Sequence, residues 1–285
     1  MGHISKRHYE SKFCDISDKS YIEDITKNKE IVIHLAALIG IPYSYTARHS
    51  YLNTNLSGTF NILEACLKNN VSQLIHTSTS EVYGTAIKIP MNENHRLFPQ
   101  SPYAASKASA DLIVNSFYSS FNLPIITLRP FNTFGPRQSP RAVIPTIIKQ
   151  FISNQVNLSL GNINTSRDFT YVLDTVKAFE VALKSKKYGE VFNIGSNFSI
   201  KISQIINLCS KEFNIKKKIQ KDAKKFRPQN SEVMKLFCSN LKSKKYLKWK
   251  PQYTGLNGFK KALKTSIDWY KKNKNLYLSY SKKIV

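Results

Sequence analysis

A nearly continuous apolar run at residues 31–37, Ile-Val-Ile-His-Leu-Ala-Ala, constrains the fold more than any other feature of this chain. Such a run is typical of a strand that is buried on both faces of a parallel sheet. Apolar runs at residues 71–78 and 124–128 predict two further strands, and apolar residues at helical spacing predict helices at residues 48–69 and 104–121 between them. We therefore expect an α/β fold.

Two polar segments flank the start of the second predicted helix. Residues 77–84 read Thr-Ser-Thr-Ser-Glu-Val-Tyr-Gly, and residues 101–107 read Ser-Pro-Tyr-Ala-Ala-Ser-Lys. The first segment follows a strand, at the edge where open α/β sheets bind ligands, and Pro102 suits the first turn of a helix. Tyr103 and Lys107 are four residues apart and share a helix face. Because a nearby ammonium favours phenolate, we expect Lys107 to lower the pKa of Tyr103 and to make it a useful base.

A Tyr-x-x-x-Lys pair is common on helix surfaces, so the pair by itself identifies no active site. Here Thr79 adds a hydroxyl for the same reacting oxygen, and Glu81 adds a second acid/base group. With these residues the two segments resemble the extended short-chain dehydrogenase/reductase family, in particular its nucleotide-sugar 4,6-dehydratases. The resemblance runs from about Cys14 to Trp269, which is nearly the whole chain.

The resemblance implies a doubly wound, parallel-sheet, Rossmann-like domain at residues 1–135. A smaller C-terminal α/β substrate-binding subdomain is expected at residues 136–285, with some of its segments returning to the first domain. Family members begin with a strand, a glycine-rich turn and a helix that holds the pyrophosphate. None of the ten glycines forms such a turn, and the first after Gly2 is Gly40.

We therefore expect an N-terminally incomplete Rossmann-like domain that lacks one βα unit and a strand. A strand at residues 8–14 would have no neighbour, and the strand at residues 31–35 would expose one edge. Several unpaired backbone groups would then cost on the order of 1–3 kcal/mol each. Residues 1–285 alone are expected to fold poorly and to bind NAD weakly. The chain is either an incomplete reading of the protein or an inactive relative.

The reaction that the resemblance implies is an NAD-dependent dehydration across C5 and C6 of the sugar. Tyr103 takes the proton of the C4 hydroxyl as hydride passes to NAD, and Lys107 supports Tyr103 and contacts the nicotinamide ribose. Thr79 hydrogen-bonds the C4 oxygen, and Glu81 removes the C5 proton before hydride returns to C6. Ser80 stands where some dehydratases carry aspartate, which leaves Glu81 or water to protonate the departing hydroxyl.

The resemblance also assigns the binding residues. Those expected to contact the cofactor are Asp15, Ile16, Leu35, Ala36, Ala37, Asn55, Thr77, Ser78, Tyr103 and Lys107. The cofactor is expected to be NAD, and NADP stays open because the segment that discriminates between the two is absent. Those expected to hold a nucleotide-diphosphate sugar are Asn132, Arg167 and Arg227. For Arg167 the alternative is a structural ion pair with Asp168 or Asp174.

Three alternatives to a dehydratase remain. A nucleotide-sugar 4-epimerase shares Tyr103 and Lys107 but has no need for a base such as Glu81. A UDP-glucuronate decarboxylase shares residues 79–84, but typically has an acidic residue just after the tyrosine, where this chain has Ala104. An inactive truncated relative, or a non-catalytic binding protein, is the third and is favoured by the missing glycine turn.

Charge and cysteine usage bound the remaining possibilities. The net charge of +25 admits polyanionic partners, but the lysines are interspersed along the chain, so we read them as solvated faces and expect no specific nucleic acid. Four scattered cysteines predict neither a metal site nor disulfides. No membrane-spanning run or signal peptide is recognisable, so a cytoplasmic enzyme is expected. The helices at residues 55–69 and 106–121 carry apolar residues on more than one side, and the resemblance implies that they pair about a two-fold axis into a homodimer.

Overall fold

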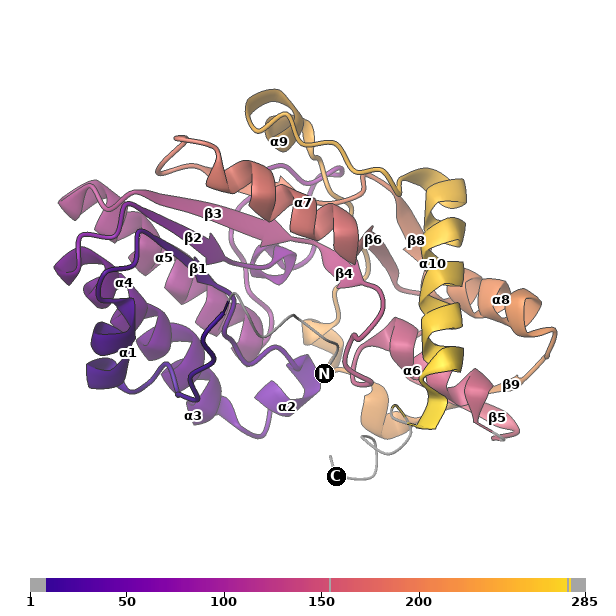
Figure 1. Cartoon of the computed structure of the whole chain (residues 1–285). Helices are drawn as coiled ribbons and strands as arrows, with labels where there is room; N and C mark the ends of the chain where they lie inside the picture. The colour runs from indigo at the N-terminus through magenta and orange to yellow at the C-terminus, as the bar shows by residue number, and fades with distance from the viewer. Residues whose placement is uncertain (1–8, 154, 276, 278–285) are drawn as a thin grey trace.

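Four parallel strands form the central sheet, in the order β1-β2-β3-β7 (Figure 1). The computed structural model describes residues 9–153, 155–275 and 277. The strands are β1 (Ile31–His34), β2 (Gln73–Thr77), β3 (Ile125–Pro130) and β7 (Val191–Ile194). All three pairings are parallel, so the carboxyl ends of the four strands lie along one edge. The expected α/β fold with a parallel sheet is confirmed.

Helices cover both faces of this sheet. On one face lie α4 (Gly58–Lys68) and α5 (Pro102–Phe121), and on the other lies α7 (Val172–Leu183). The α4 and α5 side is filled by a cluster that includes Leu63, Leu74 and Val114. A second cluster fills the α7 side and includes Phe192 and Trp249. Burial on both faces explains why β2 and β3 read as apolar runs.

The first strand departs from the expectation of burial on both faces. Ile31 and Ile33 are 46% and 41% exposed, because α4 covers only the face that carries His34. Among the described residues β1 ends the sheet, so the expected exposed edge is confirmed. Residues 9–14 are exposed and form no strand, and residue 8 lies outside the described part of the chain.

The predicted long helix at residues 48–69 is present, with an irregular middle. It consists of α3 (Arg48–Tyr51), a π-helical segment η1 (Leu52–Ser57) and α4. The N-terminal α1 (Lys19–Thr26) packs against α4, and Asp18 caps it by accepting the Tyr21 backbone N–H at 3.1 Å.

The remaining strands build two small sheets beside the main one. One has the order β4-β6-β8 and the other pairs β5 with β9. These strands are β4 (Asn132–Phe134), β5 (Asn157–Leu160), β6 (Ser166–Tyr171), β8 (Ser199–Lys201) and β9 (Lys218–Lys221). Around them lie α6 (Val143–Ile152), α8 (Ile202–Phe213), α9 (Leu241–Tyr246) and α10 (Gly255–Lys272). Their own core includes Phe134, Ile147 and Phe259.

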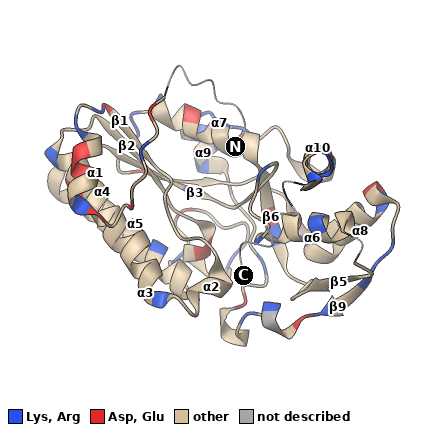
Figure 2. Cartoon of the chain, turned by 60° about the horizontal axis from the view of Figure 1, so that its bottom comes forward, with Lys and Arg blue, Asp and Glu red and all other residues tan. Residues whose placement is uncertain are grey.

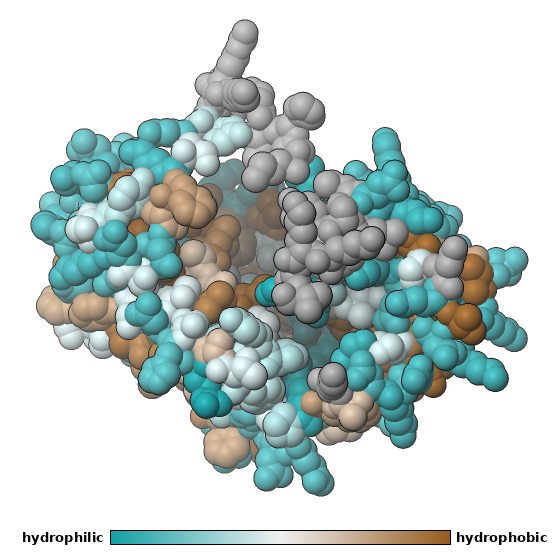
Figure 3. Space-filling model, turned by 90° about the horizontal axis from the view of Figure 1, so that it is seen from below, coloured by the Kyte–Doolittle hydropathy of each residue, from teal (hydrophilic) through white to brown (hydrophobic). Residues whose placement is uncertain are grey.

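The two halves of the molecule enclose a hollow. The space-filling view from below shows the surface indented between the half that holds α4 and the half that holds α8 (Figure 3). The short helix α2 (Ile41–Ser44), which follows β1, and the turn η2 (Ser80–Tyr83), which follows β2, lie on this side of the sheet. The hollow therefore lies at the carboxyl edge of the sheet, where ligands are expected.

Candidate active site

The turn after β2 is shaped by a threonine cap and a glycine. Thr79 caps η2 by accepting the Glu81 backbone N–H at 3.3 Å. Gly84 ends the turn at φ 64°, and a Cβ there would lie 2.0 Å from the Phe98 carbonyl oxygen. Only glycine fits this position without strain. The turn thus holds the buried residues Ser80 and Glu81 at the end of the sheet.

The start of α5 brings Tyr103 and Lys107 to the same place. Ser101 caps the helix by accepting the Ala104 N–H at 3.1 Å, and Pro102 occupies the first turn as predicted. Lys107 Nζ donates to the Thr77 carbonyl at 2.7 Å, across from helix to strand. The Thr77 hydroxyl beside it is buried and has no partner among the described residues. That hydroxyl and the ammonium are suited to a polar ligand.

The expectation that Tyr103 has a lowered pKa is wrong for the protein alone. Burial of the ring raises the pKa of Tyr103, and a hydrogen bond with the Thr79 side chain only partly opposes this. Burial also lowers the pKa of the Lys107 ammonium to about 8, against the opposing charge of Asp111. Desolvation outweighs a helix-spaced charge because both groups are almost fully buried.

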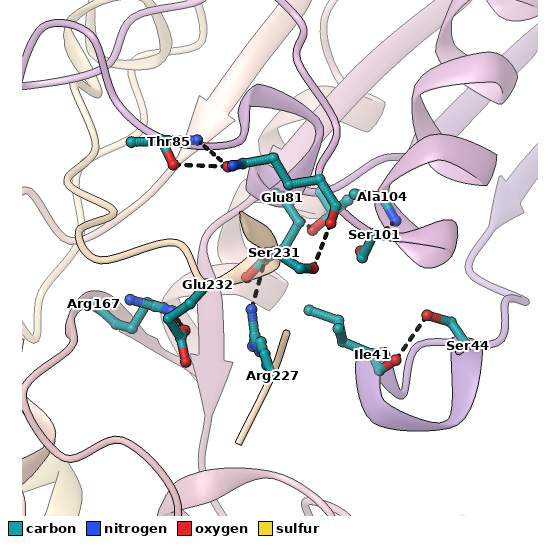
Figure 4. A network of polar contacts seen from close by, with 12 residues as sticks. Ile41, Ser44, Glu81, Thr85, Ser101, Ala104, Arg167, Arg227, Ser231 and Glu232 are labelled. Carbon is teal, nitrogen blue, oxygen red and sulfur yellow. Dashed lines mark hydrogen bonds and ion pairs between the residues drawn. The ribbon is translucent and has the colours of Figure 1, made fainter. Parts of the chain in front are cut away.

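Two arginine–carboxylate pairs stand beside this centre. Arg227 lies 3.6 Å from Glu81, and Arg167 lies 3.4 Å from Glu232 (Figure 4). Burial lowers the pKa of the Arg167 guanidinium, and the neighbouring Glu81 opposes this shift. The alternative pairing of Arg167 with the aspartates of its own segment is wrong, because both accept other hydrogen bonds: Asp168 from Ser196 and Cys238, and Asp174 from Gln252 and Tyr253.

The loop that carries Arg227 and Glu232 is tied to the opposite wall. The Ser231 hydroxyl donates to the Gln100 carbonyl and lies 2.6 Å from the Tyr45 hydroxyl. The Gln100 amide returns a hydrogen bond to the carbonyl of Asn230 at 2.9 Å. These contacts join segments that are more than 100 residues apart (Figure 4). The loop therefore bridges the two halves next to Glu81.

The third residue expected to bind the substrate lies on β4. Within the described part of the chain, the half-buried side chain of Asn132 makes one long hydrogen bond, at 3.5 Å, to the Asp168 carbonyl. Because that contact is weak, the Asn132 amide is available to a ligand. The three residues expected to bind the nucleotide-diphosphate sugar thus come from β4, β6 and the loop at residues 227–232.

Some of the residues expected to contact the cofactor are exposed, and others already make contacts within the protein. Leu35 and Ala36 are exposed at the carboxyl end of β1, and Ala37 is half-buried. Asn55 is fully buried and clamps the following loop through two hydrogen bonds with the Leu38 backbone, at 2.8 and 2.9 Å. An exposed run of small and apolar residues held by a rigid clamp fits a flat ring system.

The others are already engaged. Ile16 packs on Gly58, where a Cβ would lie 2.6 Å from its side chain. The exposed Asp15 carboxylate accepts both the N–H and the hydroxyl of Ser17 at 2.8 Å. The Ser78 hydroxyl donates to Asp111 at 2.7 Å. These three residues contribute to folding, and their expected contact with a cofactor stays a prediction.

Sequence reasoning missed the charged cluster directly behind Lys107. Asp111 is buried and receives hydrogen bonds from Arg129 at 2.9 Å and from Ser78, and it lies 3.2 Å from His76 Nε2. Its position four residues after Lys107, on the same helix face, was a signal of this contact in the sequence.

Within the described helices, none is long and apolar enough to cross a bilayer.

Comparisons with known proteins agree with this geometry. Residues 2–262 match the sequence model of the family described as GDP-mannose 4,6 dehydratase. A dTDP-D-glucose 4,6-dehydratase of Homo sapiens is 30% identical over 277 residues, which cover 94% of this chain and 77% of that protein.

Solved structures of similar shape include both dehydratases and epimerases. The dTDP-glucose 4,6-dehydratase of Bacillus anthracis, in complex with NAD, has a TM-score of 0.85 and 27% identity over 97% of this chain and 84% of that chain. The UDP-glucuronic acid 4-epimerase of Bacillus cereus, in complex with UDP-glucuronic acid and NAD, has a TM-score of 0.83 and 28% identity, covering 90% and 80%.

Proposed function

Because this chain belongs to the family described as GDP-mannose 4,6 dehydratase, we propose that it is an NAD-dependent 4,6-dehydratase of a nucleotide-diphosphate sugar. The observation that carries this choice is Glu81, a buried carboxylate on the turn that also bears Thr79. The charge of Glu81 raises the pKa of Tyr103, so the two acid/base groups lie close together in one site. Dehydration needs two such groups, one for O4 and one for C5.

The chain's own residues supply the first proton transfer. Tyr103 is the base that takes the proton of the sugar C4 hydroxyl, and Thr79, whose side chain hydrogen-bonds Tyr103, binds the same oxygen. A tyrosine with a raised pKa is protonated at neutral pH, so the charge of Lys107 is needed to favour the phenolate when Tyr103 acts as a base. The Thr77 carbonyl holds the Lys107 ammonium in place at 2.7 Å.

Glu81 performs the second proton transfer. Oxidation at C4 makes the C5 proton acidic, and Glu81 removes it and passes it to the C6 hydroxyl, which departs as water. A proton derived from solvent returns to C5 when hydride is returned to C6. In the protein alone Glu81 is paired with Arg227. A diphosphate offers guanidinium groups a better bidentate partner than a carboxylate at 3.6 Å. Substrate binding to Arg227 and Arg167 therefore frees Glu81 for the reaction.

NAD fits the carboxyl edge of β1 and β2. The residues that would hold it are the exposed Leu35 and Ala36, the unpartnered Thr77 hydroxyl and Lys107. A bound NAD would supply the hydride acceptor for C4 and the hydride donor for C6. Around it, Asn55 keeps the loop after β1 in place, and the buried Tyr103 excludes water from the sugar C4. NAD is thus regenerated in each turnover.

The experiment is product analysis in heavy water with a panel of nucleotide sugars, NAD being supplied. With NAD at a concentration high enough to fill a weak site, the wild-type chain is expected to give a 4-keto-6-deoxy product that carries deuterium at C5. Glu81→Gln should slow elimination by about 100-fold or more and retain some C4 oxidation, whereas Tyr103→Phe should abolish both. The matched control is Glu180→Gln, which changes an exposed glutamate on α7 and should behave as wild type.

A 4-epimerase is the second candidate, because an epimerase is among the similar structures. It would return the hydride to C4 and leave C5 unlabelled. A product that is epimerised at C4 and lacks C5 deuterium would refute the dehydratase assignment.

A further inference from the structure

A buried charged cluster lies behind the active site, between α5 and strands β2 and β3. Its centre is Asp111, which is 6% exposed and sits one helical turn beyond Lys107. Proton transfer at the sugar requires no group at this depth. A buried carboxylate nevertheless costs free energy unless it is paired and hydrogen-bonded, so its contacts indicate what it does.

Asp111, on α5, connects strands β2 and β3. The Ser78 hydroxyl, at the end of β2, donates to Asp111 Oδ2 at 2.7 Å, and His76 Nε2 lies 3.2 Å from Oδ1. From β3, Arg129 donates through Nε to Oδ2 at 2.9 Å, with a second nitrogen also at 2.9 Å. Three elements are thereby held together at one carboxylate.

The residue between the two β2 contacts is Thr77, whose carbonyl receives the Lys107 ammonium at 2.7 Å. Asp111 thus fixes the strand on both sides of the acceptor and the helix that carries the donor. It also places a negative charge one turn from Lys107. We propose that Asp111 is a positioning residue that keeps the Lys107 ammonium charged and seated on the Thr77 carbonyl.

The charges around Lys107 support this assignment. Five titratable or charged groups surround Lys107: Tyr103 and Asp111 on its own helix, His34 on β1, His76 on β2, and Arg129 on β3 behind Asp111. Of these, the charge of Asp111 is the one that opposes the effect of burial on the pKa of Lys107. Burial lowers the pKa of both histidines, so they stay neutral and cannot substitute for the carboxylate. Hydrogen bonding from His76 and the charge of Arg129 overcome burial and lower the pKa of Asp111, which therefore stays ionised.

The test is a direct titration of Lys107 by carbon-detected NMR of the full chain labelled at the lysine side chains. The Lys107 signal is identified by its loss in Lys107→Met. The wild-type midpoint is expected near pH 8. In Asp111→Asn, which keeps the shape of the side chain, the midpoint should move down by about one unit, the low end of the effect of a neighbouring opposite charge.

Because Asp111→Asn leaves the Arg129 charge buried and unpaired, the double variant Asp111→Asn/Arg129→Gln is measured as well. It removes both charges and should show the same lowered midpoint. The matched control is Asp174→Asn, which removes another buried carboxylate that accepts two backbone hydrogen bonds and should leave the midpoint at its wild-type value.

A double variant with a wild-type midpoint would overturn the proposal, because Asp111 would then serve only to balance Arg129. Failure of both variants to fold would assign Asp111 to the stability of the sheet and would overturn it too. The effect of Asp111 on the reaction rate rests on the proposed dehydratase function. In the pH profile of the rate, the limb at high pH should move by the same amount as the titration midpoint of Lys107. If the wild-type chain yields no dehydrated product but the Lys107 midpoint is lowered in the Asp111 variants, the proposed dehydratase function is refuted and the role of Asp111 is supported.

Discussion

Lys107 illustrates how a functional residue can oppose stability. Its ammonium is buried, and desolvation lowers its pKa from 10.5 to about 8. Between those two values the unfolded chain binds more protons at this residue than the native protein. The free energy of unfolding therefore rises with pH in that window, and the buried charge costs stability below pH 8. The full cost is about 3 kcal/mol.

Lys107→Met should accordingly melt at a higher temperature than the wild-type chain at pH 7. Between pH 7 and pH 9 the wild-type protein should gain about 1 kcal/mol from this residue, and the variant should gain none. Thermal unfolding at both pH values checks this, with Lys177→Met on the exposed face of α7 as the control. An equal melting temperature at pH 7, or a difference that grows toward pH 9, would contradict it.

The sequence predicted which side chains meet at this site but did not predict how burial shifts their pKa values. Helical spacing and a strand-end turn were enough to bring Tyr103, Lys107 and Thr79 together. The pKa of Tyr103 could not be predicted, because burial of its ring depends on Tyr51, whose ring centre lies 6.2 Å away and which is 52 residues distant in sequence. Desolvation is a property of packing and has no local pattern.

Among the elements, the loop at residues 227–232 contributes most to the arrangement of the site. It brings Arg227 to Glu81 and Glu232 to Arg167, and Ser231 anchors it to the opposite wall. Its shape is therefore expected to govern how well substrate binds rather than how fast the bonds change.

Ser231→Ala tests that role. The variant loses the hydrogen bonds to Gln100 and Tyr45, each of which contributes about 1 kcal/mol. KM should rise by about 3- to 10-fold, with kcat within about 2-fold of wild type. Steady-state kinetics on the accepted nucleotide sugar measures this, and Thr265→Ala, which removes an exposed hydroxyl on α10, is the control. A lower kcat at unchanged KM would show that the loop acts in the chemical step instead.

Long helices could be predicted from the sequence, whereas short strands, and strands that form only by pairing with another strand, could not. The helices at residues 48–69 and 104–121 repeat an apolar face over several turns. By contrast, β9 is exposed along its whole length and carries lysine at both ends, so no apolar alternation marks it. The predicted strand at residues 8–14 is wrong over its described residues because a strand needs a neighbour to pair with, and a sequence window contains none.

At the scale of the whole molecule, the surface carries both scattered basic residues and exposed apolar side chains. Lysine and arginine are spread over many separate segments of both halves (Figure 2). Three exposed apolar residues lie on the helices that cover one face of the sheet: Phe60 on α4 is 40% exposed, and Leu112 and Phe121 on α5 are 64% and 53% exposed. Phe117 lies between the two phenylalanines, with ring centres 5.7 and 5.2 Å away.

We predict that this surface of α4 and α5 pairs with the same surface of a second copy, about a two-fold axis. A stable isologous interface needs about 800 Å² from each partner, which two helices side by side can provide. Sedimentation equilibrium at about 10 μM should give twice the mass of one chain. Phe60→Glu/Phe121→Glu should give a single-chain mass, because burying two carboxylates at an apolar interface without partners is unfavourable.

The control for the dimer is Leu256→Glu, which adds the same charge at a 45% exposed leucine on α10, in the other half of the molecule. It should remain dimeric. The double variant must also keep a cooperative melt, since Phe60 and Phe121 are half exposed and their loss removes little core. A wild-type chain that sediments as a monomer, or a folded double variant that stays dimeric, would place the interface elsewhere and leave the exposed rings of α4 and α5 unexplained.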